Sequence, residues 1–234
     1  MSEKLSIFGG NKIIKKKFKQ YNSIGKAEKK SANKVLKSGI LSGFVAGSGK
    51  GFLGGKFVQR FEEKLKKFYK VKHAITVNSW TSGLIASVGS LDIEPGDEII
   101  TSPFSMCASA ISILHWNAIP VFADINENTF CIDPSSVKKK ISKRTKAILV
   151  ADIFGLSHDI IKINKLAKKY NLKVITDSAQ APYSFFRNKL AGTQSHIGGF
   201  SYNYHKHIHT GEGGVVVTNN RNLAERVKKI RNHA

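Results

Sequence analysis

The stretch FSYNYHKHIHTGEGG, residues 200–214, sets one lysine among closely spaced histidines. Lys206 lies between His205 and His207, and His209 follows. If these residues are extended, the three histidines share one face and Lys206 lies on the other. Two histidines one residue apart can chelate zinc, but this stretch supplies no cysteine or identified carboxylate as a further ligand. A lysine directed at a crevice that also holds an acid and a phosphate site is suited to Schiff-base chemistry, whereas a surface lysine is the simplest alternative.

Two further polar clusters follow apolar runs. Asp177 and Gln180 come directly after LKVIT, and the segment 79–83, SWTSG, follows HAITVN. In open α/β sheets, ligands gather at the carboxyl ends of the strands, and a helix N-terminus offers N–H groups to a phosphate. Serine, threonine and aspartate also cap helices routinely, so neither cluster identifies a site by itself.

Alternating elements must position these residues. Short apolar runs alternate with segments of helical periodicity from residue 72 onward, which indicates a largely parallel sheet covered by helices on both faces. We expect strands over residues 73–78, 97–102, 119–125, 145–153, 172–178, 198–204 and 213–219. We expect helices over residues 81–91, 108–116, 134–142, 158–171 and 221–234.

The N-terminal part has a different character. We expect a basic arm over residues 1–24, a helix over 26–38 and a Gly-rich loop over 39–55. The GSGKG within that loop lacks the spacing of a phosphate-binding loop, and no strand precedes it. A helix over 56–69 shows a stripe expected to face the core: Phe57, Phe61, Leu65 and Phe68. We therefore predict an arm, helix and loop over 1–55 and a large domain over 56–234.

The net charge of +22 comes from 32 lysines and only 6 arginines. Base readout and bidentate phosphate contacts favour arginine, so we expect no nucleic-acid partner and a general preference for anions instead. Cys107 and Cys131 give no disulfide framework. The sequence has no apolar run of bilayer-spanning length and no apolar signal core, so we expect a cytoplasmic protein without a membrane partner.

Several motifs in one order resemble the sugar aminotransferases of the DegT/DnrJ/EryC1/StrS family, fold-type I enzymes that use pyridoxal 5′-phosphate (PLP). The resemblance covers nearly the whole chain. The motifs are FGG, YNSIGKAE, SGILSGF, VNSWTSGL, EPGDEIITSPFSMCASA, IPVFADINENTFCID, RTKAILVADIFG, VITDSAQAP, FSYNYHKHIHTGEGG and IRNHA.

The resemblance implies roles for four residues around the cofactor ring. Lys206 is the catalytic residue, which forms the Schiff base with PLP and carries the proton. Asp177 pairs with the pyridine nitrogen and keeps it protonated. Gln180 binds the phenolic oxygen, and Ala179 packs beneath the ring.

The resemblance also implies that Ser201, Thr81 and Ser82 hold the phosphate. Met106 occupies the position where an aromatic residue usually stacks on the ring; sulfur can pack against a ring, and ordinary core packing is the alternative. Trp80 immediately precedes the phosphate turn and has no role assigned by the resemblance.

The implied activity is transfer of an amino group, from glutamate, to a nucleotide-linked keto sugar in amino-sugar and cell-surface polysaccharide biosynthesis, including lipopolysaccharide and O-antigen. The family's enzymes are longer, with a small C-terminal domain and a site completed by a second subunit. We therefore expect a homodimer and a large domain truncated at its C-terminus. Two alternatives remain: a PLP-dependent sugar dehydratase, in which histidine replaces the lysine, and a truncated non-catalytic or regulatory PLP-binding relative.

Overall fold

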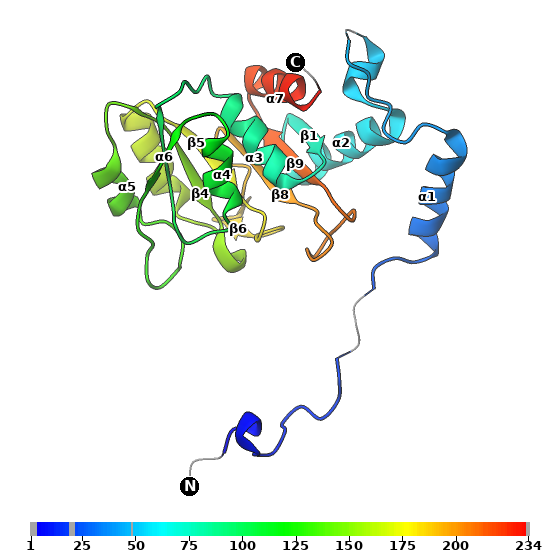
Figure 1. Ribbon diagram of the computed structural model, residues 1–234, viewed down its shortest axis with the longest axis horizontal. Coiled ribbons are helices and arrows are strands. Elements are labelled where there is room, and N and C mark those ends of the chain that lie inside the picture. The colour runs from blue at the N-terminus through cyan, green and yellow to red at the C-terminus, as the bar shows by residue number, and fades with distance from the viewer. Residues whose placement is uncertain (1–3, 19–21, 48, 233–234) are drawn as a thin grey trace. The chain divides into compact units, whose positions relative to one another are not determined.

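A computed structural model describes residues 4–18, 22–47 and 49–232. The chain divides into two compact units, Met1–Leu41 and Ser42–Ala234 (Figure 1). Within the described residues, no helix combines the length and apolar character that crossing a bilayer requires.

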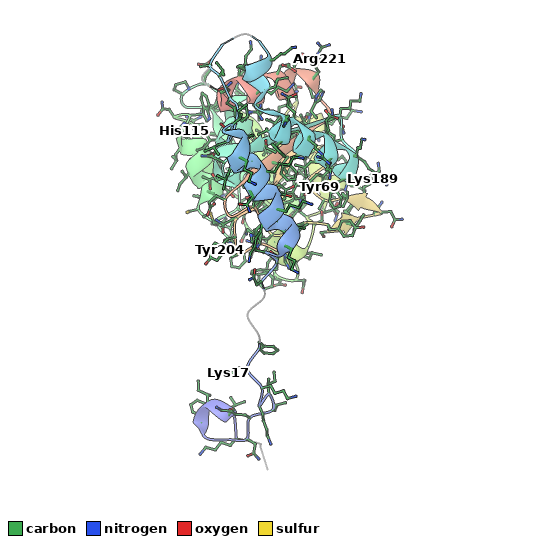
Figure 2. All side chains as sticks on the ribbon, turned by 90° about the vertical axis from the view of Figure 1, so that its right-hand side faces the viewer. Lys17, Tyr69, His115, Lys189, Tyr204 and Arg221 are labelled. Atoms are coloured by element: carbon green, nitrogen blue, oxygen red, sulfur yellow. The ribbon has the colours of Figure 1, made fainter. Side chains whose placement is uncertain are left out.

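The first unit contains a short 3-10 helix, η1 (Ser6–Phe8), and one α-helix, α1 (Lys26–Ser38). The predicted bounds of α1 are confirmed. The Glu28 carboxylate accepts the N–H of Gly25 at 2.7 Å and caps the first turn, and Gly39 ends the helix at a φ of 70°. No residue of α1 is buried, and Lys17 of the basic segment is also exposed (Figure 2).

The second compact unit begins at Ser42 and therefore includes most of the Gly-rich segment, which precedes the predicted large domain. The side-chain amide of Asn232 donates to the carbonyls of Val45 and Phe52, both at 3.1 Å. The segment also contains a 3-10 helix, η2 (Lys50–Leu53), where the sequence predicted only a loop. These contacts attach the segment to the end of the last helix.

Seven strands form one sheet in the order β1-β9-β8-β5-β4-β2-β3 (Figure 1). Strand β9 runs antiparallel to both of its neighbours, and all other pairs are parallel, so the prediction of a largely parallel sheet is confirmed. The strands are β1 His73–Val77, β2 Glu98–Thr101, β3 Ile119–Phe122, β4 Thr145–Ala151, β5 Lys173–Asp177, β8 Ile197–Ser201 and β9 Gly214–Thr218. A separate hairpin pairs β6 (Phe185–Phe186) with β7 (Lys189–Leu190).

Helices cover both faces of the sheet, as the alternating pattern predicted. Side chains of alternate strand residues pack into different core clusters, one with α3, α4 and α7, and others with α2, α5 and α6. The helices are α2 Lys56–Tyr69, α3 Trp80–Gly89, α4 Ala108–Leu114, α5 Pro134–Lys140, α6 Ile160–Lys169 and α7 Arg221–Arg231, with a 3-10 turn, η3, at Ile153–Gly155.

The bounds of α2 match the prediction, but its buried residues are Glu62, Leu65 and Tyr69, and Phe57 and Phe61 are only partly buried. Leu65 is buried, whereas Phe68 is 45% exposed and the prediction that it faces the core is wrong. Tyr69 is buried in its place, because its ring stacks on Phe200 of β8 with centroids 4.2 Å apart. Its hydroxyl lies 3.1 Å from that of Tyr202, so the buried oxygen has a partner.

Candidate functional site

The carboxyl ends of the parallel strands meet at one edge of the sheet and surround a cavity of about 320 Å³. This volume is within the range of small-molecule sites. Seven of the eight residues expected to bind a cofactor line it: Thr81, Met106, Asp177, Ala179, Gln180, Ser201 and Lys206. The eighth, Ser82, lines a neighbouring pocket instead.

Lys206 lies in a turn and not on an extended strand. Strand β8 ends at Ser201, and the backbone N–H of Lys206 donates to the carbonyl of Asn203 at 2.9 Å. The expected separation of Lys206 from the histidines onto opposite faces is therefore wrong, since Lys206 and His205 line the same cavity. Lys206 is half-buried, whereas His205 and His207 are exposed. In the described part of the chain, no group of three or more histidine, cysteine or acidic residues is placed to hold a metal ion.

Asp177 ends strand β5 and is 6% exposed. Its Oδ1 accepts the indole N–H of Trp80 at 2.6 Å and the backbone N–H of Ala179 at 3.1 Å, and its Oδ2 accepts the hydroxyl of Ser109 at 3.3 Å. Burial raises the pKa of the Asp177 carboxyl above its usual value, and the hydrogen bonds from Ala179 and Trp80 oppose that rise. The cavity therefore has a buried, strongly hydrogen-bonded acid in its wall.

A hydroxyl-rich corner lies where α3 begins. Ser79 caps the helix by accepting the N–H of Ser82 at 3.1 Å, and the hydroxyls of these two serines lie 3.1 Å apart. Thr81, in the first turn, lines the cavity together with Ser201 at the end of β8. Hydroxyls beside a helix N-terminus form a favourable site for a phosphate group. Ser82 hydrogen-bonds to Ser79 and does not line the cavity, so the hydroxyl residues of this corner that line it are Ser79, Thr81 and Ser201, of which Ser79 also caps the helix.

The side-chain amide of Gln180 is oriented by the backbone. Its Oε1 accepts the N–H of Phe154 at 3.0 Å. Because a backbone N–H can only donate, this contact assigns the oxygen and leaves the NH₂ group of Gln180 as a donor for another acceptor. Gln180 lines the cavity, so it can offer an N–H to an oxygen of a bound molecule.

Met106 is 60% exposed and lines the cavity, so the alternative that it belongs to the core is wrong. Its sulfur accepts the N–H of Ala108 at 3.3 Å, near the start of α4. This position makes the Met106 side chain available for packing against a ring in the cavity.

Sequence reasoning missed a buried polar network beside the cavity. Asp152 follows the end of β4 and lines the cavity, and its Oδ2 accepts the hydroxyl of Ser178 at 2.6 Å. Its Oδ1 lies 2.6 Å from Nδ1 of His158. The position of Asp152 after an apolar strand is the same signal that identified Asp177, and it could have been found in the same way.

The cavity thus combines an amine, a buried acid, an amide donor and a hydroxyl corner. An acid can hold a protonated ring nitrogen, a lysine can condense with an aldehyde, and hydroxyls at a helix N-terminus can hold a phosphate. This donor set fits a phosphorylated pyridine aldehyde.

Comparisons with known proteins agree with this fit. The model of the DegT/DnrJ/EryC1/StrS aminotransferase family matches residues 23–234. The spore coat polysaccharide biosynthesis protein SpsC of Bacillus subtilis (strain 168) is 36% identical over 90% of this chain and 51% of its own length. The chain therefore spans about half the length of the curated relatives it matches.

Solved structures show the same fold. PseC of Helicobacter pylori, an aminotransferase involved in the biosynthesis of pseudoaminic acid, is 37% identical and superposes with a TM-score of 0.80 over 90% of this chain and 54% of its own. A GDP-4-keto-6-deoxymannose-3-dehydratase with a trapped PLP-glutamate geminal diamine is 27% identical, with a TM-score of 0.79 over 88% of this chain and 52% of its own. The fold is that of the fold-type I aminotransferases, and the family and its liganded neighbours indicate PLP as the cofactor.

Proposed function

The chain belongs to the DegT/DnrJ/EryC1/StrS aminotransferase family, and we propose that it forms the cofactor-binding part of an enzyme that transfers an amino group from glutamate to a nucleotide-linked keto sugar. The observation that carries this proposal is that Lys206, Asp177 and Gln180 line one cavity at the carboxyl edge of the sheet.

The residues that line the cavity supply donors and acceptors of the kinds that PLP requires. Asp177 would hold the pyridine nitrogen, the NH₂ group of Gln180 would donate to the phenolic oxygen, and the hydroxyls of Thr81 and Ser201 would bind the phosphate. When bound, PLP supplies an aldehyde that condenses with amines and a ring that accepts the electron pair left on a carbon that loses a proton.

The work of the chain's own residues is to hold and to move protons. Once a substrate amine has taken its place, the amine of Lys206 would carry the proton between the substrate carbon that bears the nitrogen and the former aldehyde carbon on the other side of that nitrogen, and the half-buried place of Lys206 in the cavity wall would keep it near these atoms. Asp177 would pair with the protonated ring nitrogen, because the two N–H donors on its Oδ1 favour the carboxylate form in a buried setting.

The charge of the chain supports an anionic substrate. A net charge of +22 draws polyanions such as a nucleoside diphosphate towards the protein. The name of one matched protein, for spore coat polysaccharide biosynthesis, supports a role in building surface polysaccharides, and the name of another, for a GDP-linked sugar, supports a nucleotide-linked sugar as substrate. Assembly as a homodimer is part of the same proposal and follows from the family resemblance.

A sugar dehydratase is the second candidate, because one matched structure is a dehydratase and His205 lines the cavity beside Lys206. Transamination is favoured, since Lys206 is half-buried and His205 is exposed. The two reactions differ in their products: transamination moves nitrogen to the sugar, and dehydration removes water without such transfer.

The test is to incubate the protein and PLP with ¹⁵N-glutamate and a panel of nucleotide-linked keto sugars, and to measure ¹⁵N in the sugar product by mass spectrometry. We expect transfer by the wild type and by a control variant, Lys189→Ala, whose lysine is exposed on the β6–β7 hairpin. Lys206→Ala should give none. Loss of water from a sugar without nitrogen transfer would contradict the proposal in favour of dehydration, and no reaction with bound PLP would favour a non-catalytic relative.

A further inference from the structure

Trp80 links two parts of the site that lie far apart in the sequence. It is the first residue of α3, it is 5% exposed, and its indole N–H donates to Oδ1 of Asp177 at 2.6 Å across 97 residues of chain. A buried indole N–H needs an acceptor, and here the acceptor is the acid of the candidate cofactor site.

Two glycines make room for this indole. A Cβ atom at Gly199 would lie 2.1 Å from Cζ3 of Trp80, and one at Gly83 would lie 2.6 Å from its Cε3. Gly199 pairs with Asp177 across strands β5 and β8, so the space for the ring lies directly beside the acid. Gly83 is inside α3, where glycine is about 1 kcal/mol less favourable than alanine, so its presence is explained by the ring packed against it.

With the hydrogen bond from Trp80, the two carboxylate oxygens of Asp177 accept different numbers of hydrogen bonds. Each carboxylate oxygen accepts about two hydrogen bonds. Oδ1 receives two, from Trp80 and Ala179, whereas Oδ2 receives one, at 3.3 Å from Ser109, among the residues that the structure describes. Oδ2 is therefore the oxygen with capacity for another donor.

We propose that Trp80 is a positioning residue for Asp177: its indole N–H fixes Oδ1 and thereby directs Oδ2 as the acceptor for the pyridine nitrogen of PLP. This assignment rests on the proposed function for the identity of the cofactor. The hydrogen bond itself is a property of the protein without cofactor, and it can be tested separately.

The proposal predicts the direction in which the pKa of Asp177 shifts when the hydrogen bond from Trp80 is lost. Burial raises the pKa of Asp177, and the hydrogen bond from Trp80 lowers it. Loss of that bond should therefore raise the pKa of the Asp177 carboxyl further. A protonated, neutral carboxyl binds a pyridinium less tightly than a carboxylate does, so this rise should weaken PLP binding. The other ionisable side chains that line the cavity with it are Asp152, His205, Lys206 and Glu212.

The test compares Trp80→Phe, which keeps an aromatic ring but lacks the N–H, with Trp116→Phe. Trp116 is a matched control, because its indole N–H donates to the carbonyl of Ile85 at 2.8 Å and it does not line the cavity. Without PLP, the titration of Asp177 is followed by ¹³C NMR of labelled aspartate, assigned with Asp177→Asn. We expect its midpoint to move to higher pH in Trp80→Phe and to stay unchanged in Trp116→Phe.

With PLP, the dissociation constant is measured by absorbance as a function of pH. We expect Trp80→Phe to bind about 10- to 100-fold more weakly than the wild type, as loss of a hydrogen bond to a charged group implies. As the pH is lowered, its affinity should begin to fall at a higher pH than that of the wild type, because the Asp177 carboxylate is protonated earlier. Trp116→Phe should bind within about twofold of the wild type. Equal titration and equal affinity in the two variants would overturn the proposal.

A further measurement needs no change at Trp80. The chain has two tryptophans, so Trp116→Phe leaves Trp80 as the sole indole emitter. Its emission without PLP should follow the titration of Asp177, and Asp177→Asn should remove that pH dependence; emission independent of Asp177 would overturn the proposal. A wild type that binds no PLP would refute the proposed function, while these cofactor-free titrations would still decide whether Trp80 holds Asp177.

Discussion

Replacing Gly83 with alanine should reveal how tightly the site is built around Trp80. The added Cβ would lie 2.6 Å from Cε3 and 2.8 Å from Cζ3 of Trp80, and 3.3 Å from Cγ2 of Val77. The first two distances are shorter than any ordinary contact, so the indole must move. In the helix itself, however, alanine is the better residue by about 1 kcal/mol.

Because these effects oppose each other, Gly83→Ala should destabilise the wild type but stabilise a variant that lacks the Trp80 ring. Overpacking of a core costs about 1–3 kcal/mol, so Gly83→Ala should change the stability of the wild type by a net loss of about 0–2 kcal/mol. In a Trp80→Ala background the clash is absent, and the same substitution should stabilise the protein by about 1 kcal/mol. The coupling between the two positions should therefore be about 1–3 kcal/mol.

The assay is urea unfolding of the wild type, both single variants and the double variant. Trp80→Ala itself should cost about 3–5 kcal/mol, a loss that cancels when variants on the same background are compared. Gly89→Ala is the control in the same helix, because its Cβ would lie 2.0 Å from Cζ2 of Trp116. Its effect should be the same with or without Trp80. An effect of Gly83→Ala that is equally independent of Trp80 would refute the reasoning.

Three further expectations follow from the site. Because burial raises the folded pKa of Asp177 above its unfolded value of about 3.9, the folded state binds more protons between the two values. The wild type should thus lose stability as the pH rises through that window, and Asp177→Asn should lack this loss in urea unfolding measured from acid to neutral pH.

Ser178→Ala should destabilise the protein by about 1.5–3 kcal/mol in the same assay, since it removes the donor to the buried carboxylate of Asp152. Lys206→Ala should abolish single turnovers while changing the unfolding free energy by no more than about 0.5 kcal/mol, and His207→Ala should slow turnover less; bound zinc that disappears with His207→Ala would restore the metal hypothesis.

Local sequence patterns predicted the first and last residues of two helices correctly. The bounds of α1 and α2 were predicted as 26–38 and 56–69, and the structure has the same bounds. Glycines flank α1 at both ends, and α2 has a continuous apolar stripe, so local chemistry was sufficient. The strand predicted over 198–204 ends at Ser201, because the residues beyond it turn to bring Lys206 to the cavity.

The sequence could predict those site residues that lie at the carboxyl ends of neighbouring parallel strands. Asp177 and Ser201 each end a parallel strand, and the carboxyl ends of parallel strands share one edge, so their proximity follows from topology. The pairing of Trp80 with Asp177 depends on which way two side chains point across the sheet edge, and no local pattern encodes that direction. No local pattern predicted that Ser82 hydrogen-bonds to Ser79 and does not line the cavity, because this also depends on side-chain direction.

The central claim is that Lys206 is the residue that binds the cofactor covalently. The most direct measurement is to add PLP to the protein, reduce it with borohydride, digest it and locate the pyridoxyl group by mass spectrometry. The chain has 32 lysines, so the position of the label is informative. We expect one equivalent on the peptide that contains Lys206, and none on that peptide in a protein first saturated with an amino donor, whose amine takes the place of the lysine. No label, or a label spread over other lysines, would contradict the account.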